Sequence, residues 1–391
     1  MGRTSVLQEV RVMRFEDVYG RYQAGRLSCE DAADVLGMSV SSFFRWRRRV
    51  DAHGLAGLAD SRIGRASARR APVDEVMRVL ALFETRYFDF TAKHFHEKLA
   101  GEHGVTRSYS WTKNTLQAAG KMVRAKRKGA HRRRRPRRPM VGMMLHQDGS
   151  RHEWAAGQAW DLIVTMDDAD STIYSAFFVA EEGTMSSLRG IGEVIAAHGL
   201  FGSLYADRGS HYWITMAAGK VDKDNPTQVR RALEQLGIEL IPAYSPEARG
   251  RSERMFGTLQ NRLPQELRLR AITDMTTANR FLKESFIPDH NRRFRALPAE
   301  PDTAFVAYAG RDLLDILCIQ EERTVGNDNT VRYLGRILQI PADRHRNHYV
   351  KCKVRVHEQP DGSLAIFHGP RCLARYDPRG NIVLSSQQAA A

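Results

Sequence analysis

Three acidic residues in the middle of the chain have the types and spacing that metal-assisted chemistry requires. Asp148 follows the apolar run 140–147, and Asp207 follows the short strand-like run 203–206, so both are expected at strand ends. If those strands are neighbours, the two acids repel each other unless a cation compensates their charge. A divalent metal supplies that charge, and Mg²⁺ prefers carboxylate oxygens as ligands.

A third acid is expected from the helix that follows the last strand of this region. Ser245 can cap that helix and Pro246 suits its first position, which places Glu247 in the first turn. The helix dipole alone explains an acid there. Glu253 lies two turns further on, beyond the reach of the dipole, and near Gly250, which permits close approach. Glu253 is therefore the preferred third ligand.

Other residues compete for the first position. Four acids lie in or beside the run 159–166, and the last three fall in M-D-D-A-D-S-T, a composition typical of a hairpin turn: Asp161, Asp167, Asp168 and Asp170. Turn chemistry is the favoured interpretation of this group. His146 would point to the same side of its strand as Asp148, so it either faces the site or is a packed histidine, and the packed role is favoured.

These residues match a known pattern. The stretches D-G-S (148–150), Y-A-D-R-G-S (205–210) and S-P-E-A-R-G-R-S-E-R (245–254) resemble the D-D-E motifs of integrase-type transposases of bacterial insertion sequences. The arrangement P-x-x-x-G-x-x-E falls on Pro246, Gly250 and Glu253. The stretch D-G-S-x-H-x-W (148–154) and the Asp167-Asp168 pair are most similar to the transposases grouped as "not classified yet". The resemblance covers nearly the whole chain.

The sequence departs from that family at one place. Between Asp207 and Glu253 lie 45 residues, more than the family usually has, and the surplus is expected in the polar segment 217–227. An insertion in a surface loop need not move the acids. The chain has no His-His-Cys-Cys zinc module before the core, which excludes the retroviral branch of the family.

The resemblance implies a mechanism and a set of partners. Two Mg²⁺ (or Mn²⁺) ions would be held in each active site, with Asp148 bridging them and Asp207 and Glu253 each fixing one. The reaction would be metal-dependent cleavage and transfer of DNA strands, with no covalent protein intermediate. Its partners would be double-stranded DNA, namely the terminal inverted repeats and a target. Two ends must be handled together, which implies at least a dimer on DNA.

The elements around these acids predict a mixed sheet. Runs typical of strands alternate with helical runs at 186–198 and 227–236, and the strands are expected at 140–147, 159–166, 173–180, 203–206 and 238–242. The fold class is therefore multidomain α + α/β + β. We expect helix-turn-helix units at 1–60 and 61–120, a basic linker at 121–139, an RNase H-like catalytic core at 140–310 and a small β-barrel at 320–385.

The N-terminal helices predict a DNA reader. Helical runs at 15–24, 29–36 and 40–50, with a glycine-containing turn before the third, are typical of a helix-turn-helix unit. The third run contains four arginines within five positions, which favours DNA reading over a plain solvated face: Arg45, Arg47, Arg48 and Arg49. A weaker three-helix pattern follows at 73–83, 92–100 and 111–119. Its histidines, His94, His96 and His103, are interpreted as ordinary helix-surface residues, because no cysteine lies near them.

Most of the net charge of +15 is concentrated in one segment. Residues 121–138 contain eleven Lys and Arg and no acid. Such a run is a solvated tether between folded parts, and we expect that it also lies on DNA phosphate and releases counterions. The proposed DNA-contacting residues of this segment are Lys126, Arg127, Lys128, Arg132, Arg133, Arg134 and Arg135.

The C-terminal region is rich in short strands. They are expected at 324–325, 330–338, 349–357, 364–368 and 382–384, a spacing that suggests a small closed barrel. This module either caps the fold or mediates dimerisation, or it contacts DNA through a set of basic residues: Arg344, Arg346, Lys351, Lys353 and Arg355. The segment 289–297, D-H-N-R-R-F-R-A-L, is expected to be turn-rich and resembles the segment that closes the integrase core.

Composition excludes several classes of protein. Hydrophobic residues make up 42% and charged residues 27% of the chain, which argues against intrinsic disorder. No apolar run approaches the ~18 residues of a membrane span. Four scattered cysteines without a C-x-x-C pair argue against a disulfide scaffold and fit a reducing compartment. The resemblance implies a cytoplasmic, nucleoid-associated location. Two rival functions share parts of the pattern, a transcriptional regulator and an RNase H-like nuclease without strand transfer.

Overall fold

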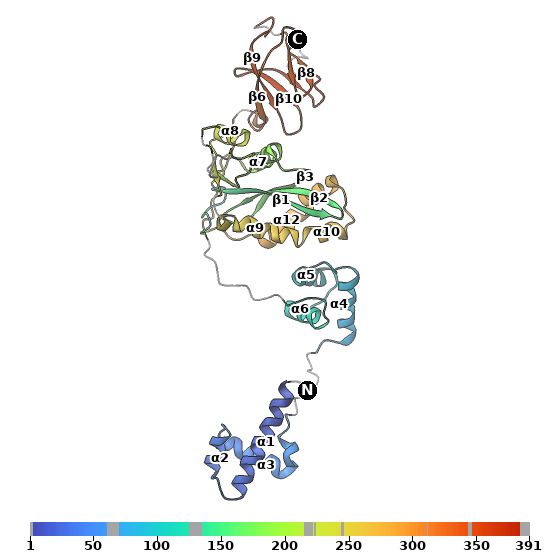
Figure 1. Ribbon diagram of the computed structural model, residues 1–391, viewed down its shortest axis with the longest axis vertical. Coiled ribbons are helices and arrows are strands. Elements are labelled where there is room, and N and C mark those ends of the chain that lie inside the picture. Colours follow the sequence, from blue (N-terminus) through green and yellow to red (C-terminus); the bar gives the residue numbers. More distant parts are fainter. Residues whose placement is uncertain are drawn as a thin grey trace. The chain divides into compact units, whose positions relative to one another are not determined.

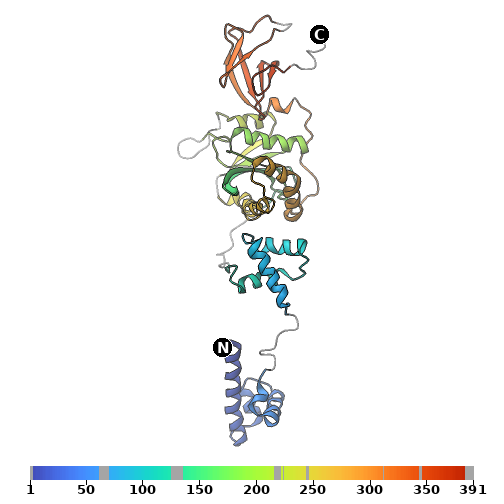
Figure 2. The same ribbon diagram turned by 90° about the vertical axis from the view of Figure 1, so that its right-hand side faces the viewer.

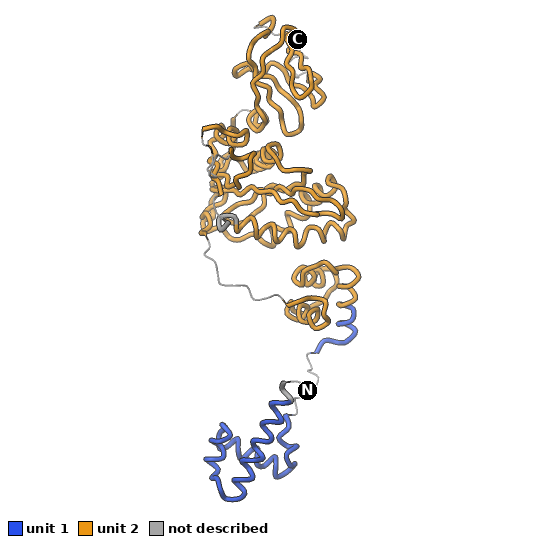
Figure 3. Tube along the Cα trace, viewed as in Figure 1, with its two compact units in different colours: residues 1–78 blue, residues 79–391 orange. Residues whose placement is uncertain are grey.

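A computed structural model describes residues 3–60, 70–124, 135–214, 222, 224–243, 246–310, 312–342 and 346–383, with the backbone alone for residues 3–5 and 246–249. The chain divides into two compact units, residues 1–78 and 79–391 (Figure 3). Each unit has its own helices, and the larger unit also contains the sheets (Figure 1). No helix within the described ranges is both long and apolar enough to cross a membrane.

The first unit contains the predicted helix-turn-helix. Its helices are α1 (Arg3–Gln23), α2 (Cys29–Val35) and α3 (Val40–His53), followed by the 3-10 turn η1 (Gly54–Leu58). Ser28 caps α2 in a capping box with Asp31, and Ser39 caps α3. Gly37, between α2 and α3, has a φ of 63°, a conformation that glycine adopts without strain. Phe15 of α1 and Phe43 of α3 are fully buried and pack together in its core.

A second helical bundle follows. Its helices are α4 (Val73–Thr85), which crosses the boundary between the units, α5 (Ala92–Glu102) and α6 (Tyr109–Ala118). Thr91 caps α5 and Ser108 caps α6. The buried core of the bundle is built mainly from large apolar and aromatic side chains: Val79, Phe83, Tyr87, Phe90, Phe95, Leu99, Val105 and Leu116. The predicted existence and order of these three helices are confirmed.

The region that follows the basic linker is built on a five-stranded mixed sheet. Its strands are β1 (Leu145–Ala155), β2 (Gln158–Asp167), β3 (Ile173–Val179), β4 (Ser203–Ala206) and β5 (Glu239–Pro242). The order across the sheet is β3-β2-β1-β4-β5. The first three strands form an antiparallel meander, while β4 runs parallel to β1 and β5 parallel to β4. This order is that of an RNase H-like sheet, which confirms the predicted fold class.

Helices cover both faces of the sheet (Figure 1 and Figure 2). On one face lie α7 (Thr184–His198) and α8 (Gln228–Gln235), and their apolar side chains join Leu145 and Leu204 of the strands in one core cluster. The other face packs against α9 (Pro246–Gln260) and α10 (Leu263–Leu269), whose Met255, Phe256, Leu259 and Leu263 meet Leu162 and Val164 of β2. Beyond them lie α11 (Met275–Phe281), a π-helical turn (Leu282–Phe286) and α12 (Ile287–Phe294).

Two local predictions in this region were wrong. The strand predicted at 140–147 begins at Leu145 and continues to Ala155, so Asp148 lies inside β1 rather than at its end. The reason is that β1 pairs with β2 over its whole length. The turn at Gly157, which has a φ of 71°, joins the two strands and lets this pairing continue to Ala155. The segment 289–297 was expected to be turn-rich, but most of it lies in α12, where the buried Ile287 and His290 anchor a helical face.

The C-terminal strands form an open arrangement around one core. A four-stranded antiparallel sheet has the order β11-β10-β9-β6, and β7 pairs only with β8 among the described strands. The bounds are β6 (Ile319–Thr324), β7 (Thr330–Tyr333), β8 (Arg336–Gln339), β9 (Lys353–Glu358), β10 (Leu364–His368) and β11 (Arg371–Tyr376), with a 3-10 turn, η4 (Leu313–Asp315), before them. The predicted closed barrel is not confirmed. The single strand predicted at 330–338 is a hairpin, because Leu334 and Gly335 both take positive φ, at 47° and 73°.

We expect His290 to make the second unit sensitive to acid. Burial and the charge of Arg262 lower the pKa of His290 to about 4 from an ordinary value of 6.5, against a smaller opposite effect of Asp289. Between those values the unfolded chain binds a proton that the folded chain does not, so stability falls as the pH falls through this window. The free energy of unfolding, measured with urea on the full chain, should fall between pH 7 and pH 5 by about 2 kcal/mol more in the wild type than in His290→Gln. Parallel pH curves for the two proteins would contradict this assignment.

Candidate catalytic site

Asp148 lies in β1, and Asp207 follows directly after the neighbouring strand β4. In the parallel pairing of β1 and β4, Leu145 is opposite Leu204 and His146 is opposite Tyr205, a constant difference of 59 residue numbers. The same difference separates Asp148 from Asp207, so this register, continued two residues beyond the last recorded pair, brings the two acids level with each other. Asp148 is 9% exposed, and Oδ1 of Asp207 accepts a hydrogen bond of 2.8 Å from the backbone N–H of Gly209.

A further carboxylate that the sequence did not predict, that of Glu182, lies against β1 at Gly149, on the face opposite to the Asp148 side chain. Burial raises the pKa of the Tyr212 hydroxyl well above its ordinary value, and the negative charges of Glu182, Asp148 and Asp207 act in the same direction. A Cβ atom on Gly149 would overlap the carboxylate of Glu182, so the glycine of D-G-S makes room for it. A glycine inside a strand was the signal that could have indicated a close approach here.

Glu253 occupies a different place. It lies on α9 and is exposed, while its neighbour Ser252 is buried. Two turns later on the same side of the helix, Gln260 donates a hydrogen bond of 3.0 Å to Ser150 of β1, which fixes the helix over this strand. Among the residues that the structure describes, no three His, Cys, Asp or Glu residues are close enough to form a metal-holding group. The structure thus brings Asp148 and Asp207 together and does not bring Glu253 into contact with them; the Glu247 side chain lies outside the described residues.

The competing acids do form the predicted turn between β2 and β3. Asp167 accepts hydrogen bonds from the N–H groups of Gly142 and Ala169, and its burial raises its pKa to about 6. Asp170 binds both the backbone N–H and the hydroxyl of Thr172. Asp161 accepts a bond of 2.7 Å from the N–H of Glu182.

Asp168 has contacts that reach well beyond this turn. Oδ1 of Asp168 lies 2.7 Å from Nε2 of His146, so His146 is a packed histidine, as favoured from the sequence. The same carboxylate binds Arg135, Arg251 and the backbone N–H of Arg138. Burial opposes its ionisation, but the bonds from His146 and the Arg138 N–H hold the pKa of Asp168 well below its usual range. Asp168 is therefore a charged, buried carboxylate at neutral pH.

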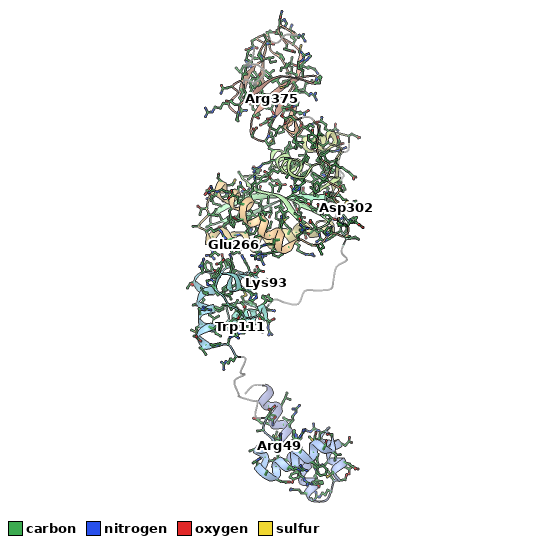
Figure 4. All side chains as sticks on the ribbon, turned by 180° about the vertical axis from the view of Figure 1, so that it is seen from behind. Arg49, Lys93, Trp111, Glu266, Asp302 and Arg375 are labelled. Atoms are coloured by element: carbon green, nitrogen blue, oxygen red, sulfur yellow. The ribbon has the colours of Figure 1, made fainter. Side chains whose placement is uncertain are left out.

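The arginines of α3 divide into two groups. All four line one hollow on the helix surface, where Arg45, Arg48 and Arg49 are exposed, and Figure 4 labels Arg49. Arg47 is half-buried instead. It donates a hydrogen bond of 3.0 Å to the hydroxyl of Tyr22 and lies over the ring of Phe44, 5.1 Å from its centroid. Three of the four predicted arginines are thus available to a ligand, and Arg47 stabilises the bundle.

Most of the predicted linker residues lie outside the described part of the chain. These are Lys126, Arg127, Lys128, Arg132, Arg133 and Arg134, as is Arg344 of the C-terminal set. Arg135 is described, and besides Asp168 it contacts the ring of Tyr205, with its guanidinium 5.8 Å from the centroid. The linker therefore meets the core beside the strand that leads to Asp207.

The second helical bundle is bound to the core by a charged network that the sequence did not predict. His94 is buried, not a surface residue, and its Nε2 lies 2.8 Å from Glu266 of α10, which is labelled in Figure 4. Lys98 also binds Glu266, and Arg262 forms two bonds with Glu97. Burial opposes ionisation of Glu266, but the bonds from His94 and Lys98 lower its pKa to about 2. No local sequence pattern predicts contacts between residues this far apart in the sequence.

Comparisons with known proteins agree with this architecture. Residues 21–84 match the winged helix-turn helix family. The putative transposase y4bF of Sinorhizobium fredii is 31% identical over 354 residues, which are 90% of this chain and 77% of that protein. The transposase for insertion sequence IS1202 of Streptococcus pneumoniae is 30% identical over 239 residues, 59% of this chain and 50% of that protein.

Two solved structures have weaker likenesses. A simian T-cell lymphotropic virus intasome in complex with the PP2A regulatory subunit B56 gamma gives a TM-score of 0.35 at 13% identity, over 79% of this chain and 99% of that chain. The HTLV-2 integrase catalytic core domain in complex with magnesium gives a TM-score of 0.28 at 13% identity, over 36% of this chain and 83% of that chain. The assignment of the fold therefore rests on the strand order alone.

The strand order is that of an RNase H-like core, which in this chain follows a helix-turn-helix unit. The identity to the Sinorhizobium protein extends over most of both chains. The chain belongs to the transposases of insertion sequences.

Proposed function

We propose that this transposase binds the terminal inverted repeats of its element and cuts and joins DNA strands there by metal-dependent phosphoryl transfer. The observation that carries the proposal is the level placement of Asp148 and Asp207 on the parallel strands β1 and β4. The family of the chain and the helix-turn-helix unit support DNA as the substrate. Target DNA would be the second substrate.

The donor groups of the site fit a hard divalent cation. Asp148 and Asp207 supply carboxylate oxygens, which are the ligands that Mg²⁺ and Mn²⁺ prefer. We propose Asp148, Asp207 and Glu253 as the residues that hold two ions per active site. When bound, the ions would activate the attacking oxygen and stabilise the leaving oxygen of the phosphate. Glu253 would have to approach β1 when metal and DNA bind, since it is exposed in this structure.

The protein groups around the acids would hold them in place. The N–H of Gly209 orients Asp207, and Gln147 on the opposite face of β1 accepts a bond of 2.8 Å from the hydroxyl of Tyr212. Nε2 of Gln147 donates to Thr165 at 2.9 Å, which ties β1 to β2. These buried bonds would keep β1 and the segment after β4 at a constant separation, as a positioned pair of acids requires.

DNA contacts would divide between the helix-turn-helix unit and the linker. The exposed arginines of α3 would read base edges, and the basic segment would bind phosphates without sequence preference. We retain the domain boundaries 1–60, 61–120, 121–139, 140–310 and 320–385 as part of this proposal. At least two copies of the chain would act together, because two DNA ends must be joined to one target.

The basic linker should contribute to binding in a salt-dependent manner. Replacing Arg132, Arg133 and Arg134 with serine should lower the affinity for any DNA and reduce the log–log salt slope by up to ~2.7, at ~0.9 for each phosphate contact. Arg135 is left in place because it binds Asp168. Binding titrations at several salt concentrations measure this slope.

A matched control removes the same charge elsewhere. Arg21, Arg189 and Arg323 each form a surface ion pair, with Asp17, Glu193 and Glu321 respectively. Their combined replacement with serine should change the slope by less than ~1. An equal change in both variants, or no change in either, would show that the linker is only a tether.

A nicking and joining assay separates the proposal from its two rivals. The purified chain is incubated with the DNA that flanks its gene and with a target plasmid, in the presence of Mg²⁺ or of a chelator. A transposase cuts at the element boundary and joins the cut end to the plasmid. A transcriptional regulator would bind without cutting, and a nuclease would cut without joining.

A further inference from the structure

We infer that Asp168 is a positioning residue, which holds the strands and the helix that carry the proposed metal ligands in register with one another. The inference rests on the proposed function, because it concerns the site through which that function would act. Asp168 has no exposed surface and follows directly after β2. It is not one of the acids proposed to bind metal.

The recorded hydrogen bonds of the Asp168 carboxylate do not stabilise the turn in which Asp168 lies. Asp167 and Asp170 supply the turn's side-chain hydrogen bonds, to Ala169 and Thr172. The bonds that the structure records for the Asp168 carboxylate all go to other segments, namely to His146, Arg135, Arg251 and the Arg138 N–H. Its backbone also connects outward, since its N–H donates to the carbonyl of Met144 at 3.0 Å.

Two of these partners belong to the elements that carry proposed ligands. His146 lies two residues before Asp148 on β1, and on a strand this spacing places both side chains on the same face. Arg251 lies two residues before Glu253 on α9. On a helix this spacing is more than half a turn, so the bond from Arg251 to Asp168 fixes the rotation of α9 about its axis and with it the direction of Glu253.

The strand that precedes Asp207 is connected to the same cluster. Tyr205 lies two residues before Asp207, and its ring packs on that of His146 with the centroids 5.1 Å apart. The guanidinium of Arg135 lies over the Tyr205 ring, 5.8 Å from its centroid. His146, Arg251 and Tyr205 each lie two positions before a proposed ligand. His146 and Arg251 bind Asp168 itself. Tyr205 contacts His146 and Arg135, which are both partners of Asp168.

The charge of Asp168 is what holds this cluster together. Arg135 and Arg251 approach each other, with Nη2 of Arg251 donating to the Arg135 carbonyl at 2.7 Å. Two guanidinium groups this close require a counter-charge, and Asp168 binds both of them. Removing its charge would take away one of the contacts that fix the rotation of α9, beside its apolar packing and the bond from Gln260, and would loosen the linker at the core. By comparison with partners that orient metal ligands in other proteins, the expected loss in metal affinity is about 10–100-fold.

The inference is tested by measuring the Mn²⁺ affinity of the full chain with electron paramagnetic resonance. No DNA is added, so the measurement does not depend on catalysis. Asp168→Asn and Arg251→Gln should each weaken Mn²⁺ binding by about 10-fold or more, and Arg251→Lys, which keeps the charge, should restore part of the loss. Asp170→Asn is the matched control, because Asp170 is buried in the same turn and binds neither His146 nor Arg251. Its Mn²⁺ affinity should stay within about two-fold of the wild type, while thermal unfolding reports on stability separately.

Each outcome decides between the two claims. If Asp168→Asn fails to fold, Arg251→Gln decides alone, since Arg251 is partly exposed and its loss leaves the other bonds of Asp168 in place. Wild-type affinity in a folded Asp168→Asn or Arg251→Gln protein, or an equal loss in Asp170→Asn, overturns the positioning role while the proposed function stands. A wild-type chain that neither binds Mn²⁺ nor cuts DNA would overturn the proposed function, and the inference with it.

Discussion

Alanine at Asp148, Asp207 or Glu253 is expected to reduce strand cleavage by at least ~10³-fold, because metal ions supply most of the charge stabilisation in this kind of phosphoryl transfer. Binding to terminal-repeat DNA should stay within about two-fold, since the arginines that bind DNA belong to other elements. Single-turnover cleavage of an end-labelled DNA duplex in Mg²⁺, together with a gel-shift titration of the same duplex, measures both quantities.

Two further acids serve as controls for the third ligand. Glu247→Ala should have a mild effect, because the helix dipole explains an acid in the first turn of α9. Glu182→Gln should reduce cleavage less than Glu253→Ala, because Glu182 lies against Gly149, on the face of β1 opposite to the Asp148 side chain. If Glu247 or Glu182 proves as sensitive as Asp148 while Glu253→Ala cleaves normally, the choice of Glu253 is wrong.

The second large effect is expected at α3. Combined replacement of Arg45, Arg48 and Arg49 with alanine should weaken binding to the terminal repeat by ~100-fold or more, because each good base contact contributes ~1–3 kcal/mol of discrimination. Binding to random DNA should fall much less, since phosphate contacts elsewhere remain. Gel-shift titrations with both DNAs at one salt concentration give the ratio of the affinity for the terminal repeat to the affinity for random DNA.

Arg47 provides the comparison on the same helix. Its guanidinium binds Tyr22 and lies over Phe44, so Arg47→Ala should lower the thermal stability of the first unit rather than its sequence preference. Equal loss on both DNAs in the triple variant would show that α3 positions the protein and does not read the sequence.

Local signals in the sequence were sufficient for most of the elements. Ser28, Ser39, Thr91 and Ser108 all cap helices, and periodic apolar runs located the strands and helices of the core. The level placement of Asp148 and Asp207 also followed from strands that could be predicted, once they were taken as neighbours. These features are local or depend on one pairing, which is why a single sequence reveals them.

Features that depend on tertiary contacts were missed. Glu182 lies against β1 only because Gly149 leaves space there, and Asp168 looks like an ordinary turn residue until His146 and Arg251 are placed beside it. The hairpin of β7 and β8 was missed because Leu334, an unusual residue at positive φ, carries no turn signal. In each case the partner is far away in sequence or the local residue type is atypical.

The most direct test of the central claim is a change of metal specificity at Asp207. Cysteine in place of Asp207 provides a soft thiolate where the wild type has a hard carboxylate, so binding should shift from Mg²⁺ toward Mn²⁺ or Cd²⁺. Strand cleavage at the end of the element by Asp207→Cys should fall by at least ~10³-fold in Mg²⁺ and recover by ~10-fold or more in Mn²⁺ or Cd²⁺, while DNA binding stays unchanged. Wild-type cleavage by Asp207→Cys in Mg²⁺, or the same loss in every metal, would contradict a metal-binding role for this carboxylate.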